Sequence, residues 1–405
     1  MLKELQTINL LDTSLLHNKY SYRIYDCIRT VPTAAWNIAT AEGSMYLSYA
    51  YLNAYQDSMC ASTEFRYVLF YDINGLAVVA CVFQKLRFSL QELLQKKITS
   101  KPLIFIASLL TASRQVSFLM CGNLFISGET GFAHHSSISK KTTLSLLDNL
   151  VQNPLRTKIF NTAFSFVVFK EFWPTSSTVF PILKNLNYHR FAIDKNMLLA
   201  IPSQWNTFEG YMRTMKTKYR TRAKSVLKKA SEIHSRKLHS QDIEAYLPEI
   251  DVLYHNVLAK SHYNLGALKA GTFLNFKKEL QEKFVFTGYF HNAILVGFSA
   301  AFIDTYFVDA NFVGVNYDFV TSHKLYQRIL YDFIGFAIDT GSKELRLGRT
   351  AETIKSGVGA VPISMYLFAK HSNRFKNILV QFVVRYITPE SPQIRKPFKN
   401  NEWIH

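Results

Sequence analysis

The stretch between Tyr306 and Pro362 constrains the fold more than any other part of the sequence. It opens with an aromatic and β-branched run, 306–313, which predicts a strand because such side chains suit a pleated, half-buried surface. Apolar residues then recur at three- and four-residue steps over 325–338, the spacing of an amphipathic helix packed on a sheet. A second strand over 344–349 follows almost at once. These elements predict a βαβ unit with a right-handed crossover.

Two polar side chains interrupt the first of these strands. Asp309 and Asn311 are two positions apart, so the alternation of a regular strand places them on one face. A strand this apolar is normally covered on both sides, where an unpaired carboxylate is costly. Asp309 is therefore predicted to be either a satisfied structural partner or a site residue.

The end of the stretch resembles a known family. The block Leu-Gly-Arg-Thr-Ala-Glu at 347–352 is followed by Lys355, by Gly-Ala-Val-Pro at 359–362 and by a closing strand at 365–368. Thr350 is placed to act as the N-cap of a short helix. In this order the elements are similar to the second half of the FemAB-like proteins, the tandem-GNAT group often labelled peptidoglycan biosynthesis or BioF2-like acyltransferases.

This resemblance implies an α/β (α+β) fold with two GNAT-like domains, each a mixed, mostly antiparallel sheet flanked by helices. The length of 405 residues also favours two cores. A helical stretch before an Asn-Gly hairpin, at Tyr51–Asn53, returns before a second hairpin at Phe273–Asn275, as a duplication requires. We expect an N-terminal domain at 1–200, a C-terminal domain with the active site at 201–390, and a basic tail at 391–405.

Composition restricts the partners and the compartment. A formal charge of +18 favours an anionic partner such as a lipid headgroup, a nucleic acid or a phosphorylated substrate. The 4 cysteines are far apart, which argues against a zinc site or a disulfide framework. No secretory signal is visible, and the apolar run Pro102–Leu110 is too short to cross a bilayer. We expect a cytoplasmic protein, with peripheral attachment to the inner face of the membrane left open.

The densest basic segment lies between Tyr211 and Lys229. Almost no acidic residue accompanies its cations, so ion pairing within the segment cannot explain them. The alternative is a solvated helix face, which most charge runs form. Lys218, Arg220 and Arg222 are its candidate anion-binding residues.

The chemistry implied by the resemblance needs a base for the amine, donors for an oxyanion and a proton for the leaving group. No Ser-His-Asp or Cys-His order with a nucleophile elbow appears, which disfavours a covalent acyl-enzyme. Asp309 is the first choice for the general base, supported by Asn311. Glu352 is the competitor for that role.

The donor is expected to be a co-substrate, with no tightly bound cofactor and no metal. Between Phe312 and Leu325 the chain has Gly314 but lacks the glycine-rich pyrophosphate loop of ordinary acetyl-CoA enzymes. An acyl-carrier protein, an acyl-CoA and an aminoacyl-tRNA all remain candidates. The residues expected to bind substrate are Asn316, Tyr317, Arg346, Arg349 and Lys355. For the three cations the alternative is a surface ion pair.

Two classes of function follow. The first is an N-acyltransferase whose amine acceptor is an amino-lipid or a cell-wall precursor. The resemblance implies that use of aminoacyl-tRNA often goes with a long coiled-coil arm in the second domain. Residues 211–284 hold no sustained heptad pattern, so tRNA is the less favoured donor. The second is a non-catalytic GNAT-fold protein that binds an anionic surface or polymer. The enzyme predicts a closed pocket holding Asp309 and Asn311, and the binding protein predicts those residues in salt bridges.

The first half offers one weaker site. Gly122 and Gly128 interrupt a strand-like run, where the backbone must bend or approach something closely. Asn123 and Glu129 either line a cleft there or belong to a bulge with Glu129 in a salt bridge.

Overall fold

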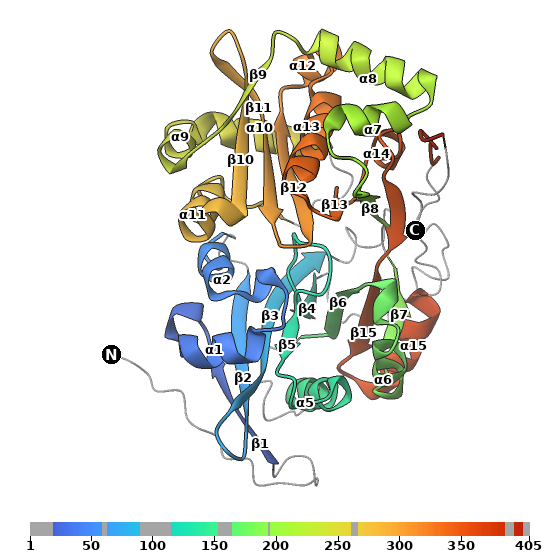
Figure 1. Ribbon diagram of the computed structural model, residues 1–405. Helices are drawn as coiled ribbons and strands as arrows, with labels where there is room; N and C mark the ends of the chain where they lie inside the picture. The colour runs from blue at the N-terminus through green and yellow to red at the C-terminus, as the bar shows by residue number, and fades with distance from the viewer. Residues whose placement is uncertain are drawn as a thin grey trace. The chain divides into compact units, whose positions relative to one another are not determined.

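The computed structural model describes residues 19–58, 63–89, 115–152, 164–192, 195–260, 266–384 and 393–399. The chain divides into two compact units, Met1–Ile193 with Met365–Pro389 and Asp194–Ser364 with Glu390–His405 (Figure 1). Each unit is built on one mixed, mostly antiparallel sheet with helices around it, which confirms the predicted fold class. Cys60 and the run Pro102–Leu110 lie outside the described residues.

The sheet of the first unit has the order β1-β2-β3-β4-β6-β15-β7, with β5 paired to β3. Its strands are β1 (Tyr20–Tyr25), β2 (Glu64–Asp72), β3 (Ala77–Ser89), β4 (Gln115–Cys121), β5 (Phe132–His134), β6 (Phe166–Phe172), β7 (His189–Phe191) and β15 (Tyr366–His371). Its helices are α1 (Thr33–Thr40), α2 (Tyr49–Tyr55), α5 (Lys140–Gln152), α6 (Val179–Asn185) and α15 (Arg374–Val384), with short 3-10 turns at Ile28–Thr30, Met45–Leu47 and Pro174–Ser176.

The sheet of the second unit has the order β14-β8-β13-β12-β11-β10-β9. Its strands are β8 (Lys195–Ala200), β9 (His234–Lys237), β10 (Phe284–His291), β11 (Ile294–Ile303), β12 (Phe307–Val315), β13 (Glu344–Arg346) and β14 (Val361–Ser364). Its helices are α7 (Phe208–Thr214), α8 (Thr217–Lys229), α9 (Ser240–Ala245), α10 (Leu247–Lys260), α11 (Gly271–Leu280), α12 (Tyr317–Ser322), α13 (Leu325–Asp339) and α14 (Glu352–Ser356), with a 3-10 turn at Gln281–Lys283.

The two sheets repeat one plan. Each has four antiparallel strands, then a parallel pair, β4 with β6 in the first unit and β12 with β13 in the second. In each unit a helix, α2 or α11, precedes the antiparallel hairpin, β2–β3 or β10–β11. In the first hairpin Asp72 accepts hydrogen bonds from the amides of Asn74 and Leu76, and Gly75 takes the left-handed φ of +80°. The order of elements agrees with the predicted duplication.

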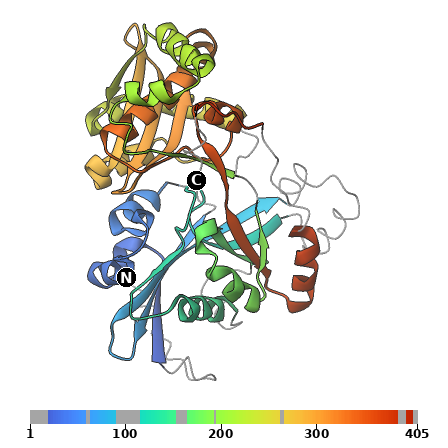
Figure 2. The same ribbon diagram turned by 45° about the vertical axis from the view of Figure 1, so that its right-hand side comes forward.

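Two strands pair in a different sheet from the strand that precedes them in the chain. β8 follows β7 in the chain but pairs with β13 and β14, whereas β15 follows β14 but pairs with β6 and β7 (Figure 2). Leu367, Phe368 and Ala369 of β15 are buried in the core of the first unit. The compact second unit is therefore not the continuous 201–390.

The C-terminal segment 393–399 packs into the second unit. Phe398 is buried, its ring centroid lies 5.3 Å from that of Trp205, and its backbone bridges to Met215. This part of the expected basic tail thus contributes to the core.

Helices cover the second sheet on both faces. On one face Phe273 and Phe276 of α11 pack, with tilted and edge-on rings, against Phe298 and Phe302 of β11. On the other face α13 buries its apolar stripe, whose largest contributors are Leu325, Ile329, Leu330, Phe333, Ile334 and Ile338. Burying such side chains stabilises the unit by roughly 1.5–3 kcal/mol each. Among the described residues, no helix combines the length and apolar character needed to cross a membrane.

Candidate functional site

The parallel strands of the second unit separate after a short contact. β12 and β13 pair only from Phe307 with Glu344 to Asp309 with Arg346, although β12 continues to Val315. On its other side β13 pairs with β8, and this pairing continues beyond Arg346, where the amide of Leu347 donates to the carbonyl of Met197 at 2.8 Å. The parallel ladder therefore ends at Asp309 and Arg346.

Asp309 is buried, with 2% of its surface exposed, and it lies opposite Phe302 on β11. The pairing shifts at the next positions, because Ala301 faces Ala310 while Ala300 faces Phe312. Asn311 is thus the extra residue of a β-bulge, which breaks the alternation of the strand. Simple alternation would place Asn311 on the face of Asp309. Because of the bulge, Phe312 lies on that face.

The turn after β13 has an unusual backbone. Gly348, Thr350 and Ala351 have left-handed φ values of +69°, +65° and +52°. For residues other than glycine this conformation is strained, and runs of such residues aim backbone N–H groups into a common concavity that suits an anion. The predicted N-cap role of Thr350 is therefore wrong. Ala351 occupies the N-cap position of α14, and no side chain caps the helix.

Lys355 is buried behind this turn with 4% of its surface exposed. Its Nζ donates to the carbonyl oxygen of Arg349 at 2.5 Å. Burial lowers the pKa of Lys355 to about 7, although the Glu352 carboxylate acts in the opposite direction. Burial also lowers the pKa of Arg349 to about 10. Lys355 lacks much of the solvation it would have in water, a deficit that an anion would offset, whereas the half-buried Arg349 keeps part of its contact with solvent.

Two tyrosines complete this group. Burial raises the pKa of Tyr326 on α13, and neighbouring Tyr317 and Glu352 raise it further, so its phenol stays protonated. Tyr317 on α12 has the Lys260 ammonium 3.5 Å from its ring centroid. We call Tyr317, Tyr326, Arg349, Glu352 and Lys355 the α14 cluster.

Sequence reasoning selected four members of the α14 cluster and missed Tyr326. The signal available for Tyr326 was an aromatic hydroxyl in the first turn of the helix that follows the Asp309 strand. Asn316 instead caps α12, since its side chain accepts from the amide of Asp318 at 2.9 Å. Arg346 pairs with Glu344 at 3.2 Å, and its guanidinium lies 3.6 Å from the Phe307 ring centroid.

Solved structures of similar fold can be compared with this geometry. A tandem GNAT protein from the clavulanic acid biosynthesis pathway superposes with a TM-score of 0.50 and 8% identity over 88% of this chain and 99% of that one. FemX superposes with a TM-score of 0.50 and 8% identity over 84% of this chain and 93% of FemX. A conserved protein of unknown function from Bacteroides thetaiotaomicron superposes with a TM-score of 0.50 and 11% identity over 85% of this chain and 98% of that one. The chain has a tandem GNAT fold. This confirms the predicted architecture. At the level of sequence, no protein-family model and no curated protein matches.

The basic helix α8 belongs to the second GNAT unit. Ala223 and Val226 face the core, Lys218 and Arg222 are exposed, and Arg220 is half-buried. The helix contains no acidic residue, so its outer surface is uniformly cationic.

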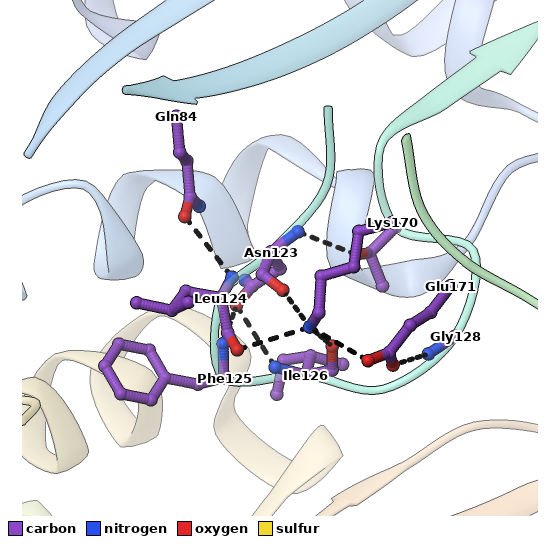
Figure 3. A network of polar contacts seen from close by, with 9 residues as sticks. Gln84, Asn123, Leu124, Phe125, Ile126, Gly128, Lys170 and Glu171 are labelled. Atoms are coloured by element: carbon purple, nitrogen blue, oxygen red, sulfur yellow. Dashed lines mark hydrogen bonds and ion pairs between the residues drawn. The ribbon is translucent and has the colours of Figure 1, made fainter. Parts of the chain in front are cut away.

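The first GNAT unit holds a buried polar network beside its own parallel strand pair (Figure 3). The Nζ of Lys170 donates to the carbonyl oxygens of Asn123, Leu124 and Ile126 at 2.5, 3.2 and 2.7 Å. The Asn123 side chain accepts from the amide of Phe125 at 2.9 Å. These contacts fasten the loop after β4, so Asn123 has a structural role.

A cavity of about 340 Å³ adjoins this network in the first GNAT unit, where Glu42, Glu129, His134 and Lys140 supply its polar lining. Glu129 accepts hydrogen bonds from the amide of Trp173 and from the Ser176 hydroxyl, and it forms no salt bridge with a described residue. Lys170, which also lines the cavity, already has three carbonyl partners, so its charge is better satisfied than that of Lys355. The α14 cluster is therefore the stronger candidate site.

Proposed function

We propose that the protein is an N-acyltransferase that transfers an activated acyl group, fatty-acyl or aminoacyl, to an amine on a lipid or a cell-wall precursor. The observation that carries this proposal is the burial of Lys355, with its pKa lowered to about 7, behind the strained turn at which β12 and β13 part. A fold alone does not define an activity, so the assignment rests on these groups.

In this proposal Lys355 and Arg349 bind a phosphate of the acyl donor. An anion next to Lys355 restores the electrostatic stabilisation that burial removed, and the turn from Gly348 to Ala351 adds backbone N–H donors. Gly314 does not serve an acetyl-CoA loop, because a Cβ there would lie 2.1 Å from a ring carbon of Phe298 and the chain then enters α12. These features favour a donor held differently from ordinary acetyl-CoA.

We assign proton acceptance to Glu352. The amine attacks the acyl carbon, a C–N bond forms, and the carboxylate of Glu352 takes the proton that the nitrogen loses. The bond from the acyl carbon to sulfur or oxygen then breaks, and the Tyr326 phenol protonates the leaving group. Glu352 is half-buried and thus accessible, whereas Asp309 is enclosed in the sheet. Asp309 is proposed to position the strands at the end of the parallel ladder.

The proposed function is tested by amide formation in vitro. Purified protein is combined with isotope-labelled acyl-CoA, acyl-carrier protein or aminoacyl-tRNA and with an extract of lipids and cell-wall precursors from the source cells. We expect labelled acyl groups in a product that resists neutral hydroxylamine, because amides survive it while esters and thioesters do not. Labelled product that hydroxylamine cleaves, or no enzyme-dependent product with any donor, contradicts the proposal.

We also propose that the protein reaches its acceptor at an anionic membrane surface. The cationic face of α8 supplies long-range attraction. In the first unit, α15 exposes Phe375, Ile378 and Phe382 by 84%, 57% and 42% of their surface, an apolar stripe beside Arg374 and Lys376. Such a stripe suits shallow insertion between headgroups.

Replacing Lys218, Arg220 and Arg222 by Gln is expected to weaken binding to phosphatidylglycerol vesicles by roughly a hundredfold, since each cation near such a surface contributes about 1 kcal/mol. The loss should shrink as salt rises. Vesicle co-sedimentation measures it. The matched control replaces three exposed lysines of the first unit, Lys140, Lys141 and Lys184. Equal losses in both triple variants would show that net charge alone acts.

A further inference from the structure

Three potential metal ligands from distant parts of the chain meet in the second unit. Glu232 lies in the turn after α8, His291 ends β10, and His323 follows α12. Their ligand atoms all lie within 4.8 Å of one another. The α14 cluster shares no residue with this group.

Two of the three spacings within the group match the edge of a coordination tetrahedron. The Nε2 atoms of His291 and His323 lie 3.4 Å and 3.5 Å from the same oxygen, Oε2 of Glu232. Zinc bonds to nitrogen and oxygen are about 2.0–2.2 Å long, so neighbouring ligand atoms of a tetrahedral site are separated by roughly 3.3–3.5 Å. Both contacts therefore have the length of a tetrahedral edge and exceed that of a good charge-assisted hydrogen bond.

The hydrogen bonds around His323 indicate which of its nitrogens carries a proton. The Ser322 hydroxyl donates to the carbonyl oxygen of Asp318 at 2.6 Å, and its single proton is then used. Nδ1 of His323, 2.8 Å from the same hydroxyl oxygen, must therefore be the donor in that contact. In a neutral imidazole this leaves the lone pair of Nε2 facing the Glu232 carboxylate, and a cation between them would be bound by both groups.

We propose that Glu232, His291 and His323 bind a divalent zinc ion. Two imidazole nitrogens and one carboxylate oxygen are ligands that zinc accepts, and a fourth position stays open. The Ser322 hydroxyl supplies the outer hydrogen bond that orients a ligating histidine. The expectation of no metal rested on cysteine spacing, and these ligands have no recognisable spacing in the sequence.

A zinc ion here would join three segments that are far apart in the sequence. His323 directly precedes Lys324, whose φ of +57° places a non-glycine residue in the strained left-handed region at the start of α13. Fixing His323 therefore holds the α12–α13 junction, and these two helices carry Tyr317 and Tyr326. The inference is independent of the proposed acyl transfer, because it concerns binding and stability.

Competition between the protein and a chromophoric zinc chelator at pH 7.5 tests the site. We expect one zinc ion bound with micromolar or tighter affinity and a melting temperature that rises by a few degrees when one equivalent is added. Glu232→Gln and His323→Ala should each weaken binding by at least tenfold and abolish the rise. Glu232 is exposed, so Glu232→Gln is expected to fold as the wild type does.

His255→Gln is the matched control. His255 lies 3.4 Å from the Asp251 carboxylate on an exposed part of α10, where no third ligand among the described residues joins it. This variant should bind zinc as the wild type does. Wild-type affinity in Glu232→Gln, or equal losses in Glu232→Gln and His255→Gln, would overturn the proposal. A folded wild type that releases its zinc to a weak chelator would overturn it as well.

Discussion

Lys355→Met is expected to lower kcat/KM for the acyl donor on the order of a hundredfold while the protein stays folded. The variant removes the charged hydrogen bond to the donor phosphate, and such bonds are worth about 1.5–3 kcal/mol. Methionine retains the length of the side chain and needs no solvation, so the buried position accepts it. Steady-state kinetics in the amide assay measure the change, with circular dichroism as the check on folding.

The pH dependence identifies the group responsible. Because the pKa of Lys355 is about 7 without substrate, its ammonium form is lost as the pH rises through that value. Binding of an anionic donor favours the protonated form, so donor affinity should fall above about pH 7 in the wild type and should be independent of pH there in Lys355→Met. The same falling limb in both proteins would exclude Lys355 as the phosphate ligand.

The free energy of unfolding should change with pH in the opposite direction to donor affinity. The pKa of Lys355 in the folded protein is about 7, below its ordinary value of 10.5, so between these values the unfolded chain binds the additional proton. The contribution of Lys355 to the free energy of unfolding therefore rises with pH from about 7 toward 10. Lys355→Met should lack this contribution. Urea unfolding at several pH values measures it.

Glu352→Gln is expected to lower kcat by roughly a hundredfold or more, the usual contribution of a general base, with little change in melting temperature. Glutamine retains the shape of the side chain and removes its ability to accept the proton. Asp309→Asn is the matched comparison, because it makes the same chemical change in the enclosed carboxylate. We expect Asp309→Asn to lower the melting temperature more than Glu352→Gln does and to lower kcat less.

The opposite pattern would reassign the base. If Asp309→Asn folds normally and loses a hundredfold in kcat while Glu352→Gln retains activity, Asp309 accepts the proton, as its position in the sequence first indicated. Equal small effects of both variants would count against catalysis by either carboxylate and favour the non-catalytic alternative.

Local sequence patterns predicted the helices and strands of this fold better than they predicted which strands pair. The apolar spacing over 325–338 and the Asn-Gly turn near Gly75 each depend on residues close together in the chain, so their signals are local. The pairing of β15 with the first sheet is decided by long-range packing of residues such as Phe368, which strand propensity does not report. The bulge at Asn311 likewise depends on the register with β11.

The candidate site shows the same division. The block at 347–352 pointed to Arg349 and Glu352 through its resemblance to a family. The burial of Lys355 and the approach of Tyr326 arise from how α13 and α14 pack, and residue identity alone does not encode them. Arg346 was selected by type, but Glu344 and Phe307 already engage it.

The amide assay performed on variants of both units tests the central claim, that acyl transfer takes place at the α14 cluster. Glu352→Gln represents the second unit, and His134→Gln, in the lining of the first-unit cavity, represents the rival location. The account predicts that His134→Gln forms the hydroxylamine-resistant product at the wild-type rate and that Glu352→Gln forms it at least roughly a hundredfold more slowly. Wild-type rates in Glu352→Gln, with the loss found in His134→Gln instead, would contradict it.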